Sequence, residues 1–334
     1  MSILVSVVIL TYKHEEFIKQ TVKSTLQQIT DFDVEIIIAD DSSPDNTEFV
    51  INSIIEENKG HNTIKYFRHK TNIGAHFNGP FAINKCSGKY IAFCEGDDYW
   101  TDPYKLQKQV DFLEANPEYV ACFHDVEAIG KDGQIVHEHT LKVPENYETI
   151  YDIAQNGNFI HTPSIVFRNV LGSLPEHFFL SPIGDFYIYM LLAAKGKFYY
   201  MRESMAVYRC DVGSFSTLDA KIKSLKFNQC IFLIWLHFKN KNKQLSAILF
   251  NRLWAYIKNA ESSTAISDIL DPYPVNKEEI LTEWLFQLEE VYRGKLKEEA
   301  NNSVNVYLRE AGIVFLSKVI FYKIRTRIVI WIKK

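Results

Sequence analysis

The sequence lacks the short motifs of several common nucleotide-binding and metal-binding proteins. It contains no Walker-type Gly-Lys-Ser/Thr loop and no Gly-x-Gly-x-x-Gly motif, which argues against a P-loop enzyme and against a dinucleotide-binding dehydrogenase. It also lacks a Cys-x-x-Cys pair, and its five cysteines are an odd number in mostly apolar surroundings. We therefore expect reduced core thiols in a cytoplasmic protein, at Cys86, Cys94, Cys122, Cys210 and Cys230.

Charge of one sign and long hydrophobic runs are also scarce. The 37 basic and 41 acidic residues leave a formal net charge of -4, without the basic excess that general nucleic-acid binding needs. No apolar run approaches the roughly 18 residues of a membrane span. The opening MSILVSVVIL lacks the basic region and the cleavage site of a signal peptide, so we expect a buried strand there.

Apolar runs alternate with helix-like patterns in the first third of the chain. Four continuous runs have the profile of buried parallel strands, at 4–10, 34–40, 63–69 and 89–94. Apolar residues at helical spacing follow them or lie between them, at 18–29, 44–55, 76–86 and 103–113. The alternation predicts an α/β fold with a parallel sheet covered on both faces, in which ligands bind beyond the carboxyl ends of the strands.

The remainder of the chain follows a different pattern. Residues 118–216 mix two strand patterns, at 119–126 and 163–168, with a helical pattern at 185–196. From about residue 220 the pattern is helical. Neither a repeat nor a low-complexity linker marks a boundary, which we place near 217–220.

Polar clusters follow three of the predicted strands. They are Thr11-Tyr12, Asp40-Asp41-Ser42-Ser43 and Glu95-Gly96-Asp97-Asp98. Taken alone, the second is typical of a turn with a helix cap, and the third of a solvated turn. Because adjacent parallel strands bring their ends to one rim, the three clusters together predict a shared crevice.

Three carboxylates within four positions need a counter-charge. Closely spaced carboxylates repel one another, and a desolvated carboxylate without a partner is costly. Mg²⁺ or Mn²⁺ typically takes one or two carboxylates, while phosphate oxygens complete its coordination shell. The segment from Glu95 to Asp98 therefore predicts half of a metal–diphosphate site, and a bound nucleotide would supply the other half.

Five segments, in a fixed order, carry a family resemblance. They are VSVVILTYKHEEFIKQTVKSTLQQ, IIIADDSSPDNT, NIGAHFNG, CSGKYIAFCEGDDYWTDPYKLQKQ and GDFYIYMLLAAKGKFYYMRESMAVYR. Over about residues 3–216 the chain resembles glycosyltransferase family 2. The resemblance implies an inverting enzyme of the GT-A fold, with a mixed and mainly parallel sheet, of the bacterial group that builds surface polysaccharides. It implies a catalytic domain at 1–216. The resemblance ends there, and the helical pattern predicts a mainly helical region at 217–334, which would contact the acceptor, a second copy of the chain or a membrane surface.

The resemblance also implies roles for individual residues. Tyr12 would stack on the nucleobase, and Asp41, rather than Asp40, is the favoured hydrogen-bond partner of the base or ribose. Asp98 would bind the metal, Mn²⁺ or Mg²⁺, and Asp97 would hold the ribose or also reach the metal. The full nucleotide site would comprise Thr11, Tyr12, Asp40, Asp41, Asn72, Gly74 and Asp97.

Asp185 lies at the position of the family's catalytic base. Inversion at an anomeric carbon needs a single in-line displacement, in which one carboxylate takes the proton from the attacking acceptor hydroxyl. The metal would offset the charge on the departing diphosphate. The residues alone also admit a helix N-cap or a first-turn acid at Asp185.

The sequence departs from the family in several places, and the first acid of its metal motif is Glu95 instead of the usual aspartate. An arginine-asparagine pair is missing after NIGAHFNG, so a cationic contact would come from Arg68, Lys70 or His76. The family's metal-reaching histidine is absent from YRCD, and we expect Asp211 there to act as an oxygen ligand, unless it is a surface-loop acid. No QxxRW motif follows, which argues against a processive cellulose- or chitin-type synthase.

Residues for the acceptor are less defined. Tyr99 and Trp100 would form an aromatic shelf for a sugar ring or pack in the core. His161 would line the acceptor pocket or be a structural histidine. The tail 315–334 has six basic residues and no acid, which predicts peripheral contact with an anionic membrane surface or, alternatively, a packed element or dimer contact.

The leading hypothesis is therefore a cytoplasmic, metal-dependent inverting glycosyltransferase. It would move a sugar from a UDP-linked or other nucleotide-diphosphate donor to a hydroxyl of a glycan or lipid-linked acceptor. A sugar nucleotidyltransferase shares the α/β plan and the acidic metal site but would release pyrophosphate. A glycan- or nucleotide-binding module with a degenerate site is the non-enzymatic alternative.

Overall fold

The computed structural model describes residues 3–58, 63–137, 141–210, 212–213, 215–260 and 265–299. The chain divides into two units, Met1–Pro274 and Val275–Lys334, and the candidate site lies in the first. Within the described residues, no helix combines the length and apolar character needed to cross a membrane.

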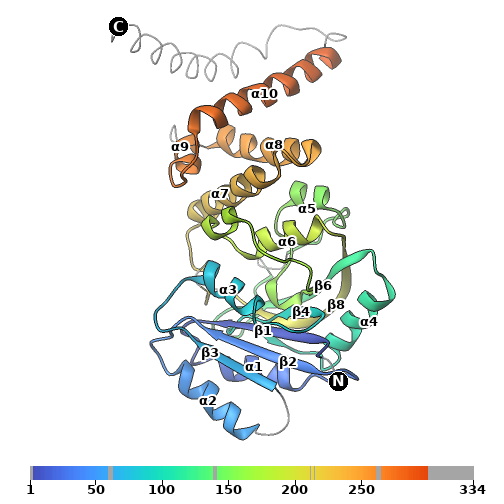
Figure 1. The fold of residues 1–334 in the computed structure, drawn as a ribbon, viewed down its shortest axis with the longest axis vertical. Coiled ribbons are helices and arrows are strands. Elements are labelled where there is room, and N and C mark those ends of the chain that lie inside the picture. The colour runs from blue at the N-terminus through green and yellow to red at the C-terminus, as the bar shows by residue number, and fades with distance from the viewer. Residues whose placement is uncertain are drawn as a thin grey trace. The chain divides into compact units, whose positions relative to one another are not determined.

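An eight-stranded sheet forms the centre of the first unit (Figure 1). The strands are β1 Val5–Thr11, β2 Val34–Asp40, β3 Thr63–Arg68, β4 Tyr90–Phe93, β5 Tyr99–Trp100, β6 Tyr119–Ile129, β7 Val166–Arg168 and β8 Lys197–Arg209. Their order is β3-β2-β1-β4-β7-β6-β8-β5. Pairing is parallel from β3 through β4 and between β6 and β8, whereas β7 is antiparallel to both neighbours and β5 is antiparallel to β8. The predicted α/β class with a mixed, mainly parallel sheet is confirmed.

Helices cover both faces of this sheet, as expected (Figure 1). Alternate side chains of β1, among them Val7, belong to one core cluster with Val22 of α1, Ile51 of α2 and Leu106 of α4. The opposite face of β1 meets α3, where Gly79 faces Leu10. The helices are α1 Ile18–Leu26, α2 Thr47–Glu57, α3 Ala75–Ile83, α4 Lys105–Ala115, α5 Ile150–Asn156, α6 Asp185–Ala193, α7 Ala220–Phe238, α8 Lys243–Asn259, α9 Ala265–Leu270 and α10 Lys277–Glu299.

A buried carboxylate ties the first strands together. Glu35 of β2 is fully buried and accepts hydrogen bonds from Ser6 Oγ in β1 at 2.6 Å and Lys65 Nζ in β3 at 2.7 Å. The amide and hydroxyl of Ser87, just before β4, bond the same carboxylate at 2.6 and 2.7 Å. Burial raises the pKa of Glu35, but these bonds outweigh it and lower the pKa to about 2. The network therefore links three neighbouring strands and the approach to the fourth.

The helical region expected from residue 220 is present as α7 to α10. Helices α7 and α8 pack on each other, and both belong to the compact unit that runs to Pro274. The catalytic boundary at residues 216 and 217 stays a prediction.

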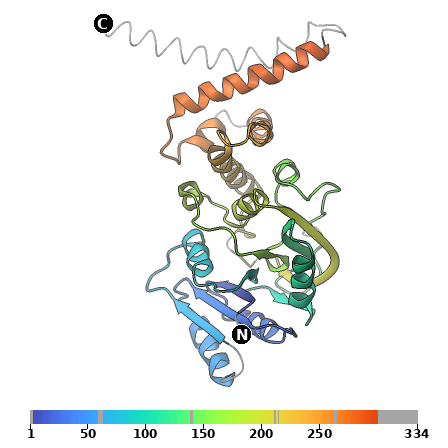
Figure 2. The same cartoon turned by 45° about the vertical axis from the view of Figure 1, so that its right-hand side comes forward.

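Strand β8 curves strongly where it pairs with β6 (Figure 2). The register of this pairing shifts near Asp125.

Candidate active site

The polar clusters that follow β1, β2 and β4 meet at one rim of the sheet. The amide of Asp41 bonds the carbonyl of Thr11 at 3.0 Å, and the amide of Gly96 bonds the carbonyl of Leu10 at 2.8 Å. Parallel strands place their carboxyl ends on the same side, which is why clusters 29 to 84 positions apart in the chain become neighbours. The three clusters are therefore neighbours, and a crevice lined by all three stays a prediction.

The acidic loop needs a glycine for this close approach. A Cβ atom at Gly96 would lie 2.5 Å from Nδ1 of His14 and 2.8 Å from Oγ1 of Thr11, closer than real Cβ contacts allow. From the other side, Oγ1 of Thr21 in α1 donates to the loop's carbonyl oxygens, 2.9 Å from Gly96 and 2.7 Å from Asp98. The loop is thereby held between the end of β1 and helix α1.

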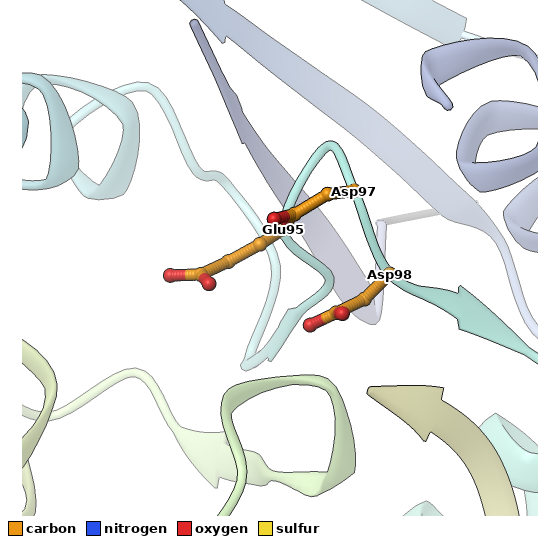
Figure 3. Close-up of side chains that lie close together, drawn as sticks. All are labelled: Glu95, Asp97 and Asp98. Carbon is orange, nitrogen blue, oxygen red and sulfur yellow. The ribbon is translucent and has the colours of Figure 1, made fainter. Parts of the chain in front are cut away.

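Glu95, Asp97 and Asp98 form the acidic cluster, and all three carboxylates point to the same side of the loop (Figure 3). One oxygen from each lies within 4.8 Å of the others. Asp98 is 1% exposed, and its Oδ2 has no hydrogen-bond partner within the described structure. Burial, followed by the neighbouring charges of Asp97 and Asp185, raises the pKa of Glu95 to about 8, and burial also raises the pKa of Asp98. Oxygen ligands, a bare buried carboxylate oxygen and mutual repulsion together fit a hard divalent cation such as Mg²⁺ or Mn²⁺.

Asp185 is the first residue of helix α6, and its role as catalytic base stays a prediction. Its Oδ1 accepts a hydrogen bond of 2.7 Å from the amide of Phe186, as a first-turn acid does. Its Oδ2 accepts one of 2.9 Å from Nδ2 of Asn158. Burial raises the pKa of Asp185, which moves this carboxylate toward the range useful for a general base.

A cavity of about 720 Å³ joins these groups. Glu95 and Asp97 line it on the sheet side, and Asp185 lines it from α6. His161 also lines this cavity, with its ring 4.6 Å from that of Tyr208. The volume suffices for a ligand of drug size, and the wall of the cavity brings Glu95, Asp97 and the candidate base together.

The aspartate that ends β2 and the aspartate that follows it accept hydrogen bonds from other groups of the protein. Asp41 accepts hydrogen bonds from the amides of Ile73 at 2.6 Å and Gly74 at 2.8 Å. Asp40 accepts from Ser43 and from Tyr66 and is fully buried. Asp41 therefore positions the loop after β3, which holds the predicted residues Asn72 and Gly74. A direct contact of either aspartate with a nucleotide stays a prediction.

The aromatic shelf does not face the cavity. Trp100 is 4% exposed, belongs to the core cluster and donates from Nε1 to the carbonyl of Pro163 at 3.0 Å. Tyr99 lies against the guanidinium of Arg209, 5.1 Å from its ring, and faces a separate surface depression. Pairing of β5 with β8 turns these two side chains to opposite faces of the sheet, so core packing is the correct description of Trp100.

The other predicted residues lie at the edge of the site or outside the residues that the structure describes. Thr11 is buried beneath the rim, whereas Tyr12 is 38% exposed with Nζ of Lys13 5.1 Å from its ring. Asn72 is exposed on its loop. Asp211 lies outside the described residues, as does the basic tail 315–334.

Only the tertiary structure identifies His14 as a neighbour of the acidic cluster. Its Nε2 lies 3.9 Å from Oδ2 of Asp97, and its Nδ1 lies 3.3 Å from Oγ1 of Thr11. Its position four residues after a predicted strand end was the available signal. Of the three candidate cations, Arg68 is paired with Asp40 and Glu48, and His76 lines the cavity, while Lys70 is exposed and does not line it.

A mainly parallel sheet with an acidic cluster at its strand ends is the architecture of GT-A glycosyltransferases, and the fold places the protein in that class. Within it, the chain belongs to glycosyl transferase family 2, because the model of that family matches residues 6–174, half of the chain.

Relatives support the assignment. The protein Rv1520 of Mycobacterium tuberculosis, itself uncharacterized, is 38% identical over 212 residues, which cover 61% of this chain and 58% of the relative. The chain thus matches less than two thirds of that relative. WfaP of Escherichia coli, named as a UDP-Glc:alpha-D-GlcNAc-diphosphoundecaprenol beta-1,3-glucosyltransferase, is 38% identical over 111 residues, or 33% of this chain and 41% of WfaP.

Solved structures share the fold at low sequence identity. TarS of S. aureus (residues 1–349) has a TM-score of 0.58 and 17% identity, with 81% of each chain covered. The mannosyltransferase PcManGT of Pyrobaculum calidifontis, in complex with GDP-Man and Mn²⁺, has a TM-score of 0.55 and 15% identity, with 90% of this chain and 85% of PcManGT covered.

Proposed function

We propose that the protein is an inverting, metal-dependent glycosyltransferase that moves a sugar from a nucleotide-diphosphate donor to a hydroxyl of a glycan or lipid-linked acceptor. The carrying observation is that Asp185 lines one cavity with Glu95 and Asp97 of the acidic cluster. Transfer requires the donor's diphosphate and the acceptor's hydroxyl to meet at one anomeric carbon, so the groups that serve each must share a space.

The donor side of the proposal rests on the rim of the sheet. Asp98, with Asp97 and Glu95, would hold Mn²⁺ or Mg²⁺, and Asp211 is a further proposed ligand. The cation, when bound, would offset the charge of the leaving diphosphate. Thr11, Tyr12 and the loop that Asp41 positions would border the nucleoside. UDP is the proposed nucleotide, since TarS was solved with UDP-GlcNAc and WfaP is named as using UDP-Glc.

The acceptor side rests on Asp185. One carboxylate that takes a proton from the attacking hydroxyl is sufficient for inversion, and a second catalytic carboxylate of the glycosidase kind is unnecessary. Asn158 and the amide of Phe186 fix the orientation of this carboxylate before the acceptor arrives. His161 is proposed as an acceptor-lining residue.

The setting of the reaction is also a proposal. A role in surface-polysaccharide synthesis at the inner face of the cell membrane agrees with the named activity of WfaP, whose acceptor carries a diphosphoundecaprenol. Peripheral membrane contact through the basic tail concerns residues outside the structural description. This contact and self-association stay predictions.

A panel of nucleotide sugars incubated with Mn²⁺ tests the proposed function. We expect slow, metal-dependent hydrolysis of the correct donor, with release of a nucleoside diphosphate and with inverted configuration at the sugar. Release of pyrophosphate from a sugar phosphate and a nucleoside triphosphate would instead identify a nucleotidyltransferase. Absence of any metal-dependent binding of UDP in calorimetry would identify a degenerate binding module.

A further inference from the structure

The cavity lined by Glu95 and Asp97 of the acidic cluster is also lined by two basic residues. Its carboxylate-bearing residues are Glu95, Asp97 and Asp185, whereas its lysine and arginine are Lys223 of α7 and Arg252 of α8. A metal–diphosphate complex held at the acidic side does not explain cations carried by two helices that lie beyond the matched family region of residues 6–174. The two cations differ in their surroundings, and the difference separates their roles.

Lys223 serves the turn beside the acidic cluster. Its Nζ donates a hydrogen bond of 2.5 Å to the carbonyl of Ser216. In the same turn, a Cβ atom at Gly213 would lie 3.5 Å from Oδ2 of Asp97. Lys223 is therefore partly engaged by backbone on the donor side of the cavity.

Arg252 has much of its hydrogen-bonding capacity left. Its Nη1 donates to the carbonyl of Ala154 at 2.9 Å, and its Cζ lies 5.4 Å from the ring centroid of Phe227. Within the described residues, no carboxylate forms an ion pair with it. Burial lowers its pKa, because the surroundings penalise the charged form. A guanidinium carries five N–H donors in a rigid fork that suits phosphate or carboxylate oxygens, and most of that fork remains for a ligand.

Two series of contacts connect Arg252 with the residues around the candidate base, Asp185. Gly157, at a φ of +87°, lies against the guanidinium, because a Cβ atom there would be 2.8 Å from Nη2 and 3.0 Å from Nη1. The next residue, Asn158, donates to Asp185. In the second series, Phe227 contacts Phe186, with ring centroids 5.0 Å apart. The guanidinium is therefore one residue removed from the group that orients the base.

We propose that Arg252 binds an oxyanion, a phosphate or a carboxylate, carried by the acceptor. The inference rests on the proposed function, since it takes Asp185 as the group that receives the acceptor's hydroxyl. An anionic group held at Arg252 fixes the acceptor at a second point, so that its hydroxyl meets Asp185 in one orientation. Arg252 is thus a specificity-determining residue, and Gly157 provides the space that its guanidinium needs.

Calorimetry on the full chain, saturated with UDP and Mn²⁺, tests the subsite. The probes are a hexose 1-phosphate, a hexuronic acid and the uncharged methyl glycoside of the same hexose. We expect at least one charged probe to bind about tenfold or more tightly than the glycoside. Tighter binding of the hexose 1-phosphate would indicate a phosphate on the acceptor, and tighter binding of the hexuronic acid would indicate a carboxylate. Arg252→Gln should remove the preference, and Arg252→Lys, which keeps the charge but not the fork, should leave part of it.

The matched control is Lys258→Gln, which removes the same charge from an exposed position of α8 and should leave the preference intact. Equal binding of all probes by the wild type, failure of every probe to bind, or a preference that survives in Arg252→Gln would overturn the proposal. Melting curves separate a loss of the subsite from a loss of the bond to Ala154. Failure of the wild type to bind UDP with Mn²⁺ would count against the proposed function itself, and that binding is measured first.

Discussion

The backbone amide of Arg209 in β8 donates a hydrogen bond of 2.8 Å to Oδ1 of Asp98, which lies 111 positions earlier in the chain. This bond fixes one oxygen of the carboxylate, while Oδ2 is buried without a partner in the described structure. A buried carboxylate held in this way has a high cost unless a cation shares it. We therefore expect a bound cation to offset a cost that the buried Asp98 carboxylate imposes on the metal-free protein.

Replacing Asp98 with Asn should separate these two effects. Removal of a buried charge beside Asp97 and Glu95 should raise the melting temperature of the metal-free protein by about 2–4 °C. The further rise that UDP with Mn²⁺ gives the wild type should disappear. Scanning calorimetry with and without these ligands measures both, and Asp31→Asn, at an exposed position, is the control. A full response of Asp98→Asn to UDP with Mn²⁺ would refute the metal assignment.

Replacing Asp185 with Asn should act on transfer alone. Loss of a general base typically lowers the rate by about 10²–10⁴-fold, whereas the donor would still be held at the strand ends. Transfer assays and calorimetry with UDP and Mn²⁺ measure the two properties on one preparation. A normal transfer rate in this variant would move the base to another residue.

Replacing Asn158 with Ala should change the pH dependence of transfer. Burial raises the pKa of Asp185, and the hydrogen bond from Asn158 opposes that rise. Without this donor the pKa rises further, so more of the base is protonated at a given acidic pH and cannot accept a proton. We expect the acidic limb of the profile of kcat/KM to move to higher pH, with a smaller loss at alkaline pH. Superimposable profiles for variant and wild type would show that this bond does not tune the base.

Replacing Gly96 with Ala should disrupt the acidic loop. The new Cβ would meet Thr11 and His14 at 2.5 to 2.9 Å, so the loop or the end of β1 must shift. We expect the affinity for UDP with Mn²⁺ to fall by about tenfold or more, since a displacement of even 1 Å is costly in such a site. Gly133→Ala is the control, because its φ of +80° strains the backbone while nothing lies within 4 Å. The control should lose stability only.

Replacing Glu35 with Gln should weaken the sheet in a pH-dependent manner. The folded pKa of about 2 lies below the ordinary value of 4.5, so the carboxylate stabilises the fold above pH 4.5 and loses this effect as the pH falls toward 2. The difference corresponds to about 3 kcal/mol at pH 7. Urea unfolding at several pH values should show the variant less stable by that amount at pH 7 and close to the wild type near pH 2. Glu57→Gln, on the exposed end of α2, should show no such convergence.

Much of the fold could be predicted from the sequence because its signals are local. The runs at 34–40 and 4–10 match β2 and β1 to within a residue, since a strand buried on both faces must be continuously apolar. The acidic cluster from Glu95 to Asp98 could also be predicted locally, because three acids directly after a buried strand repel one another and need a counter-charge. Trp100 shows the limit of such reasoning, since its neighbours in sequence are polar and only the pairing of β5 with β8 turns it into the core.

The sequence by itself predicted the four strands of the first third, the helices among them and the acidic motif, because spacing and composition act over a few residues. The family resemblance added Asp185 as the candidate base, whereas β5 and β8 were not predicted. The tertiary structure alone decided that Asp41 serves the loop at Ile73 and Gly74, that His14 lies beside Asp97, and that Arg252 shares a cavity with Asp185. Those relationships join positions up to 83 residues apart. They arise because the packing of helices on the sheet brings distant residues into contact, and a local sequence pattern contains no information about that packing.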